Sequence, residues 1–361
     1  MSFRITPGRT TLRRTAAAAT VAGLALALAA CGSDDAGSSS SGSSSSAGDY
    51  GDLSVQLSWI KNAEFLGEYQ ADSKGYYADA GFGKVNLVAG PSTGVAELVQ
   101  GKSQIALSDA ISVGTAVANE QAPVKIIGAT YQKNPFTILS LADGGNIATP
   151  QDMIGKKIGV QDSNTSLFQA LLAANGINPS QVTVVPVQYD PSVLVNGEVD
   201  GFVAYLTNES ITVQSQGHAV TNLPFADNGL PFVAETFTAT QQTIDEHADL
   251  LKAFLKAEIQ GWTDVIKDPE SAVDLDLKSY GSDLGLNRAN EVQSAHIAND
   301  SLITSADTTA NGLFTVSQDL QDETIKSLAG AGIDVKASDL FDMSLLAAVY
   351  KDNPDLVKYA G

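Results

Sequence analysis

The regular alternation of strand-like and helix-like segments constrains the fold of this chain more than any other feature. From Leu53 to Ser58, apolar and polar residues alternate one by one, which is the pattern of a half-buried strand, and Trp59 ends it. After a short polar break, apolar residues recur at helical spacing from Phe65 to Gly81. Further pairs of this kind follow along the chain. The roughly 310 residues from Leu53 onward are enough for two α/β lobes of ordinary domain size.

The N-terminal residues have the composition of a signal peptide. Arginines come first, and a run of small apolar residues from Ala16 to Ala30 follows, which is too short to span a bilayer comfortably. The run ends in Leu-Ala-Ala-Cys, the form of a lipoprotein cleavage site, at Cys31, the only cysteine of the chain. We therefore expect residues 1–30 to be removed, Cys31 to carry a lipid, and the Ser- and Gly-rich residues 31–52 to form a flexible tether. Whether export uses the general or the twin-arginine pathway stays open.

The charge of the chain excludes several classes of partner. There are 41 acidic and 21 basic residues, a formal charge of −20, and loss of the four leader arginines makes it −24. A surface this acidic repels nucleic acid and anionic lipid headgroups, so we expect neither as a partner and attribute membrane attachment to the lipid alone. Because no cysteine follows position 31, the mature chain can have neither a disulfide nor cysteine catalysis.

Polar and aromatic residues follow the predicted strands of the first lobe at their carboxyl ends. In open α/β sheets ligands bind beyond these ends, so such residues are candidates for a ligand site. The first predicted strand is the one that ends at Trp59, the second is Lys84–Ala89, and the third is Ile105–Leu107. The candidates after them are, in chain order, Trp59, Asn62, Glu64, Phe65, Ser92, Thr93 and Asp109.

The turn from Gly90 to Gly94 permits three interpretations. It matches G-x-S-x-G, the nucleophile elbow of α/β hydrolases, so a Ser92-dependent hydrolase is one alternative function. An elbow normally follows several strands, whereas this turn follows the second, which argues against a hydrolase. The turn can instead direct free backbone N–H groups and two hydroxyls toward a ligand, or Ser92 or Thr93 can simply cap the next helix.

The second half of the predicted site comes from a later set of strands. The segment Thr149–Val160 predicts a capped helical turn that leads into a strand, and Asn164 lies just beyond the end of that strand. A buried strand then ends at Tyr205, with Asn208 and Glu209 close behind it. An amide and a carboxylate there can hydrogen-bond the amino and ring-nitrogen edge of a heteroaromatic ligand. Alternatively, Glu209 caps the next helix and faces water.

Three motifs resemble those of the solute-binding proteins of ABC importers. They are W-x-x-N-x-x-F-x-G-x-Y-x-A from Trp59, T-P-x-D-x-x-G-K-K-I-G-V from Thr149 and Y-x-T-N-E from Tyr205. The group that looks closest binds thiamine pyrimidine precursors and has riboflavin-binding and sulfonate-binding relatives. The resemblance extends from Leu53 to Pro269 and implies a two-lobed α/β fold of the type II periplasmic-binding-protein kind, with the ligand cleft between lobes that two crossing strands join.

The same resemblance implies how the chain is divided and what it meets. Crossings within Phe136–Gly145 and Phe232–Thr238 divide it into a first lobe of residues 53–141, a second lobe of residues 142–235, and a return to the first lobe with C-terminal helices, residues 236–361. It further implies a monomer without a cofactor or metal that captures its ligand by cleft closure. The ligand then passes to an ABC permease with its ATPase at the outer face of a bacterial cytoplasmic membrane.

The motifs do not determine the ligand. Pyrimidine-binding relatives often resemble W-x-P-N-x-x-H in this region, but here Lys61 replaces the Pro and Phe65 replaces the His. The segment around these two residues looks nearer to riboflavin-binding relatives. A sulfonate or nitrate requires cationic groups, and the predicted cleft segments offer only Lys61 and Lys133. We therefore place a heteroaromatic vitamin or precursor first, with a thiamine pyrimidine precursor as the best candidate, and keep riboflavin and a sulfonate- or nitrate-type ligand as alternatives.

An enzymatic function has little support in the sequence. The histidines at 218, 247 and 296 form no zinc-binding pair, and the cysteine-rich run shared by fungal relatives that make the thiamine pyrimidine has no counterpart here. We expect a binding protein rather than an enzyme. In the predicted helix Thr243–Lys267, Trp262 shares a face with other apolar residues and is therefore predicted to belong to the core rather than to the ligand site. The C-terminal region is predicted to be helical, without an assigned chemical role.

Overall fold

The computed structural model describes residues 48–359. The predicted signal peptide, the predicted lipidation site at Cys31 and nearly all of the predicted tether lie outside these residues. Within the described range, no helix has both the length and the apolar character needed to cross a bilayer.

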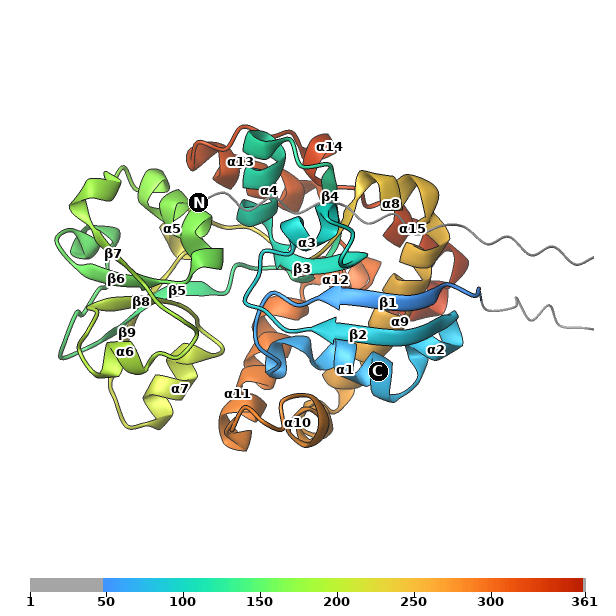
Figure 1. Ribbon diagram of the computed structural model, residues 1–361, viewed down its shortest axis with the longest axis horizontal. Helices are drawn as coiled ribbons and strands as arrows, with labels where there is room; N and C mark the ends of the chain where they lie inside the picture. Colours follow the sequence, from blue (N-terminus) through green and yellow to red (C-terminus); the bar gives the residue numbers. More distant parts are fainter. Residues whose placement is uncertain (1–47, 360–361) are drawn as a thin grey trace, which may run out of the picture. The chain divides into compact units, whose positions relative to one another are not determined.

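The described chain folds around two five-stranded sheets, as the alternating pattern predicts (Figure 1). Sheet A has the strand order β2 (Phe82–Val88), β1 (Gly51–Gln56), β3 (Ile105–Asp109), β10 (Ala234–Thr240), β4 (Val124–Tyr131). Sheet B has the order β7 (Thr183–Pro186), β6 (Lys157–Val160), β8 (Gly201–Tyr205), β5 (Phe136–Leu141), β9 (Val220–Pro224). In each sheet the fourth strand, β10 or β5, is antiparallel to both of its neighbours. The two lobes therefore share one topology.

Each of these antiparallel strands enters its sheet directly from the other lobe. The chain leaves sheet A after β4 and reaches sheet B at β5, and it returns between β9 and β10. The passages are therefore residues 132–135 and 225–233. Asn134 links them, because its side chain donates to the carbonyl of Leu230 at 2.7 Å and accepts from the backbone N–H of Phe136 at 2.9 Å.

The first passage lies earlier in the chain than the predicted crossing. The strand Phe136–Leu141, which the predicted division gives to the first lobe, pairs with β8 and β9 and belongs to sheet B. The pattern of this strand alone does not show its partners, because a buried apolar strand fits the centre of either sheet.

Helices surround both sheets. Those near the strands of the first lobe are α1 (Leu66–Ser73), α2 (Tyr76–Ala80), α3 (Val95–Val99), α4 (Ala110–Glu120), α8 (Gln241–Glu246), α9 (Ala248–Lys267) and α10 (Pro269–Leu275). Those inserted between the strands of sheet B are α5 (Thr165–Ala174), α6 (Ser192–Val195) and α7 (Glu209–Ser215). The C-terminal region supplies α11 (Arg288–Ala298), α12 (Ala306–Asn311), α13 (Gln318–Gly330), α14 (Ala337–Leu340) and α15 (Ser344–Asp352). Here α15 and α14 contact the first lobe, and α11 and α13 contact both lobes: α11 meets α10 and α7, and α13 meets α4 and α5.

Two predicted helices are each divided in the structure. The segment from Phe65 to Gly81 forms α1 and α2, because Gly75 adopts a left-handed conformation with φ of 79° between them. The segment predicted as a helix over Thr243–Lys267 forms α8 and α9, which meet at His247. Within α9, Trp262 is 1% exposed and belongs to the core, which confirms the prediction for this residue.

The close contact of α1 and α9 depends on glycine. A Cβ atom at Gly261 would lie 2.2 Å from the carbonyl oxygen of Gly67 and 3.0 Å from the backbone nitrogen of Ala71. Because both obstacles are backbone atoms, a side chain at position 261 can be accommodated only if the helices separate.

Gly261→Ala is therefore expected to lower the free energy of unfolding by about 1–3 kcal/mol, the range for overpacking in a filled core. Chemical denaturation followed by circular dichroism measures the change. Gly330, at the end of α13, is the matched control, since a Cβ atom there meets nothing within 4 Å. Gly330→Ala is expected to leave stability equal or to raise it by up to about 1 kcal/mol. Equal stabilities for the two variants would contradict the packing argument.

Candidate functional site

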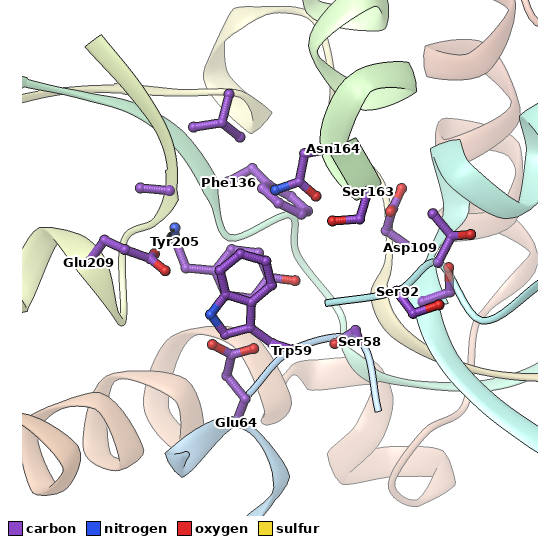
Figure 2. Close-up of a pocket in the computed structure, with 14 residues that line it drawn as sticks. Ser58, Trp59, Glu64, Ser92, Asp109, Phe136, Ser163, Asn164, Tyr205 and Glu209 are labelled. Carbon is purple, nitrogen blue, oxygen red and sulfur yellow. Dashed lines mark hydrogen bonds between the residues drawn. The ribbon is translucent and has the colours of Figure 1, made fainter. Parts of the chain in front are cut away.

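A cavity with about 460 Å³ of empty space lies between the two sheets (Figure 2). Its wall on the side of sheet A consists of Ser58, Trp59, Glu64, Ser92, Thr93, Ser108 and Asp109. Its wall on the side of sheet B consists of Phe136, Ser163, Asn164, Val203, Ala204, Tyr205 and Glu209. The carboxyl ends of β1, β3 and β8 all meet the cavity, as the rule for open α/β sheets requires.

The structure brings most of the predicted site residues together at this cavity. Those that line it are Trp59, Glu64, Ser92, Thr93, Asp109, Asn164, Tyr205 and Glu209. The remaining three, Asn62, Phe65 and Asn208, do not line it. Phe65 is fully buried in the hydrophobic core. Asn62 caps the helical turn before α1, where its side chain accepts from the backbone N–H of Glu64 at 3.1 Å and donates to the carboxylate of Glu64 at 3.0 Å.

Asn208 joins two carboxyl groups from opposite lobes. Its amide nitrogen lies 3.2 Å from Oε1 of Glu64 and 3.3 Å from Oε1 of Glu209. Burial raises the pKa of Glu64 well above its usual value, with a further increase from the charges of Glu235 and Glu209. Burial likewise raises the pKa of Glu209 to about 7. Two carboxyl groups thus face the same space, where N–H donors of a ligand can be bound.

Glu209 does not act as a solvent-facing helix cap. It is 5% exposed, and its Oε2 accepts a hydrogen bond of 2.8 Å from the backbone N–H of Tyr205. The alternative in which Glu209 faces water is therefore wrong.

Asp109 has a structural role as well as a place in the wall. Its Oδ1 accepts from the backbone N–H groups of Ile111 and Ser112 at 2.9 Å, and its Oδ2 accepts from the hydroxyl of Ser112 at 2.6 Å. This is an N-cap of α4. Burial raises the pKa of Asp109, and these hydrogen bonds oppose the increase.

Ser92 is held by its own turn. Its hydroxyl donates to Glu97 at 3.0 Å and accepts from the backbone N–H of Gly94 at 3.0 Å. Within the described part of the chain, no histidine is among the residues that line the cavity. The G-x-S-x-G match therefore lacks the histidine that serves as general base in a Ser-His-Asp triad.

Aromatic side chains from both lobes border the cavity. Trp59 follows β1, whereas Tyr205 ends β8 and packs edge-on against Phe136, with ring centroids 4.5 Å apart. Figure 2 shows the indole of Trp59 in the middle of the view, above Glu64, with Glu209 of the opposite wall at the left. A flat ring can stack on such a face while its edge reaches the carboxyl groups.

Sequence reasoning did not identify several residues at or beside the cavity. Those in the wall are Ser58, Ser108, Phe136, Ser163, Val203 and Ala204. Glu235 lies just behind the wall, where its carboxylate accepts hydrogen bonds from Ser58 and Tyr205. A single carboxylate within the otherwise apolar and Thr-rich segment Phe232–Thr240 was the available signal for Glu235, since an isolated buried charge requires specific partners.

The chain matches the protein family described as NMT1/THI5 like over residues 62–272, which is more than half of its length. The chain belongs to the NMT1/THI5-like family. This agrees with the resemblance that the motifs from Trp59, Thr149 and Tyr205 indicate.

Three curated proteins are similar in sequence to this NMT1/THI5-like chain. Riboflavin-binding protein RibY of Chloroflexus aurantiacus is 25% identical over 63% of this chain and 66% of the relative, just under two thirds of its length. Formylaminopyrimidine-binding protein of Halalkalibacterium halodurans is 23% identical over 62% of this chain and 69% of the relative. The 4-amino-5-hydroxymethyl-2-methylpyrimidine phosphate synthase of Schizosaccharomyces pombe is 27% identical over 60% of this chain and 66% of the relative.

Solved structures share the fold of this NMT1/THI5-like chain. The periplasmic nitrate-binding protein NrtA of Synechocystis PCC 6803 matches with a TM-score of 0.61, covering 85% of this chain and 90% of that one at 14% identity. The likeness confirms the two-lobed α/β fold of periplasmic binding proteins.

Proposed function

We propose that this chain is the extracytoplasmic solute-binding lipoprotein of an ABC importer. It captures a small heteroaromatic vitamin or vitamin precursor, best a thiamine pyrimidine precursor, and delivers it to the permease. The observation that carries the proposal is the cavity between the two sheets, where aromatic rings and carboxyl groups come from both lobes. The printed names of the riboflavin- and formylaminopyrimidine-binding relatives support the same kind of ligand.

The charge of the wall favours a ligand with N–H donors over an anion. Among residues 48–359, those that line the cavity include Glu64, Asp109 and Glu209 but neither lysine nor arginine, so neither Lys61 nor Lys133 is among them. A sulfonate or nitrate would meet carboxyl groups without a compensating cation, at a high cost in desolvation. An aminopyrimidine instead offers its amino group and ring nitrogens to the carboxyl groups and its face to Trp59.

Riboflavin is the second candidate. The segment from Asn62 to Tyr69 looks nearer to riboflavin-binding relatives, and RibY is a curated relative by sequence. The hydroxyls of Ser92, Thr93, Ser108 and Ser163 in the cavity wall offer partners for the polar chain of such a ligand.

A binding role suits the cavity better than catalysis. The synthase of Schizosaccharomyces pombe shows that an enzyme has a related sequence. In the present chain, the only cysteine precedes the folded lobes, and the described residues of the cavity wall include no histidine. The wall thus offers carboxyl groups, hydroxyls and aromatic faces, which suit recognition.

Ligand capture depends on both lobes. We assign lobe one to residues 51–131 and 234–359 and lobe two to residues 136–224, joined by the two passages. A ligand held between Trp59 on one side and Tyr205 and Glu209 on the other contacts both walls fully only when the cleft is closed, so binding favours the closed state. The last two residues of the predicted tether, Gly51 and Asp52, begin β1, so the proposed tether is residues 31–50. Lipidation at Cys31 and this tether would keep this monomeric domain at the outer face of the membrane, within reach of the permease and its ATPase.

Thermal-shift screening followed by solution scattering tests the proposal. The probes are hydroxymethylpyrimidine, formylaminopyrimidine, thiamine, riboflavin and an alkyl sulfonate. We expect a heteroaromatic probe to raise the melting temperature and to reduce the radius of gyration, with the probe recovered chemically unchanged. Turnover of the probe would contradict a binding role. Tight binding without a change in scattering would replace the closing cleft with a rigid pocket.

A further inference from the structure

Glu235 is a buried carboxylate that connects the two lobes just behind the cavity wall. It lies on β10 in sheet A and is 1% exposed. Its Oε1 accepts from the hydroxyl of Tyr205, on β8 of sheet B, at 2.7 Å. Its Oε2 accepts from the hydroxyl of Ser58, which follows β1 of sheet A, at 2.8 Å. Tyr205 and Ser58 both line the cavity, whereas Glu235 does not.

The backbone at Glu235 is distorted in a way that places this carboxylate. The residue has a φ of 43°, in the left-handed region that side chains with a Cβ atom rarely adopt. The pairing of β10 with β3 also shifts register between Ala234 and Thr236. Such an irregularity in a strand redirects a side chain away from the normal alternation, and strained backbone persists where the surroundings fix it.

The hydrogen bonds to Glu235 determine whether the hydroxyls of Tyr205 and Ser58 can donate a proton to a ligand. A hydroxyl has one proton to donate, and the protons of Tyr205 and Ser58 are both directed to the carboxylate. Hydrogen bonds to an ionised group are about twice as strong as neutral ones, so a ligand does not readily recapture these protons. Burial raises the pKa of Glu235 to about 7, so above this pH the carboxylate is ionised and the oxygens of Tyr205 and Ser58 can only accept hydrogen bonds from a ligand.

The opposite end of the cavity has a different character. The hydroxyls of Ser108 and Ser163 have no hydrogen-bond partner among the described residues, so they are able to donate or to accept. Figure 2 shows Ser163 with Ser92 and Asp109 at one end of the cavity and Tyr205 with Glu209 at the other. The hydroxyls of Tyr205 and Ser58 are thus committed to accepting from the ligand, whereas those of Ser108 and Ser163 can donate or accept.

We propose that Glu235 is a positioning residue that sets ligand specificity, because it turns the hydroxyls of Tyr205 and Ser58 into obligate acceptors and thereby selects a ring with N–H donors on the edge that faces them. The inference rests on the proposed function and deepens it. Two hydroxyls that can only accept would distinguish an amino-substituted ring from its oxo counterpart, because the donor and acceptor atoms along that edge are exchanged between the two rings. Glu235 acts on the ligand only through its two hydroxyl partners.

The test compares two probes, 4-amino-5-hydroxymethyl-2-methylpyrimidine and its 4-oxo analogue, by calorimetry at pH 8. This pH lies above the value of about 7 to which burial raises the pKa of Glu235. The wild type is expected to prefer the amino ring by at least about tenfold, the scale of one mismatched buried hydrogen bond. Glu235→Ala frees both hydroxyl protons and is expected to reduce the preference to about threefold or less. Glu235→Gln, which retains one acceptor oxygen, is expected to lie between them.

The matched control is Glu258→Gln in α9. Glu258 is also fully buried and also accepts the hydroxyl of a tyrosine, Tyr77, but neither lines the cavity. This variant is expected to retain the wild-type preference, so a change specific to the Glu235 variants separates selectivity from general destabilisation. An unchanged preference in both Glu235 variants, or equal binding of the two probes by the wild type, overturns the inference while the proposed function stands. If the wild type binds neither probe nor any other heteroaromatic ring, the proposed function and the inference are both overturned.

Discussion

The free energy of unfolding is expected to fall by several kcal/mol as the pH rises from about 5 to about 8, the reverse of ordinary acid denaturation. The cause is a set of buried carboxyl groups that retain their protons in the folded state. Burial raises the pKa of Glu258 and of Asp276 to about 8, and it raises the pKa of Glu209 and of Glu235 to about 7. Glu68 strengthens the effect, since both of its carboxyl oxygens are buried without a partner among the described residues.

The sign of this pH dependence follows from the pH at which the carboxyl groups lose their protons in the folded and in the unfolded chain. In the unfolded chain these groups ionise near their ordinary values, 4.5 for glutamate and 3.8 for aspartate. In the folded chain they ionise only near pH 7 to 8, so the unfolded state binds fewer protons over the interval between. Stability is therefore greatest below about pH 4.5 and is lost as the pH rises through the folded values, at about 1.4 kcal/mol per pH unit for each group that stays protonated.

Urea denaturation at about pH 5, 6.5 and 8 measures this dependence. Glu258→Gln removes one titrating group from α9 and is expected to make the fall in stability less steep by about 1 kcal/mol per pH unit. Gly330→Ala, which changes no titratable group, should keep the wild-type slope. Stability that rises with pH, or a slope that Glu258→Gln leaves unchanged, would show that these carboxyl groups are already ionised in the folded protein.

Local pattern was sufficient for much of the fold. The strand Gly201–Tyr205 ends where its apolar run predicts, and the turn capped by Thr149 before Pro150 is present. The strand Val220–Pro224 was not predicted, because its residues VTNLP lack a clear apolar alternation. Its place in sheet B depends on pairing with β5, some eighty residues earlier in the chain.

The same distinction applies to the candidate site. Trp59, Asp109 and Glu209 were predicted because each lies at or just after the end of a recognisable strand, where a general rule places ligands. Glu235 follows no predicted strand, and its only local signal is that it is a single carboxylate in an apolar segment. Its two partners are 177 and 30 residues away in the chain, and its orientation depends on a strand irregularity that pairing with β3 creates. Contacts between the lobes can be inferred only once it is known where the chain passes from one lobe to the other.

Trp59→Ala is expected to weaken ligand binding at least tenfold, which corresponds to about 1.4 kcal/mol or more. Trp59 lines the cavity, and its indole is the largest flat face there on which a heteroaromatic ring can stack. The residue is also 9% exposed and in contact with the hydrophobic core, so its removal is expected to lower stability as well. Trp59→Phe retains an aromatic face and should recover part of both losses.

The second tryptophan of the chain provides the control that separates the two effects. Trp262 is 1% exposed in α9 and does not line the cavity, so Trp262→Phe is expected to lower stability while affinity remains within about twofold of the wild type. It also leaves Trp59 as the only indole, so quenching of its fluorescence by an added pyrimidine or flavin reports stacking directly. If Trp59→Ala lowers stability as Trp262→Phe does but leaves affinity unaltered, Trp59 is a core residue whose face the ligand does not use. A loss of affinity confined to the Trp59 variants, with quenching in the single-indole protein, would assign the stacking surface of the cavity to Trp59.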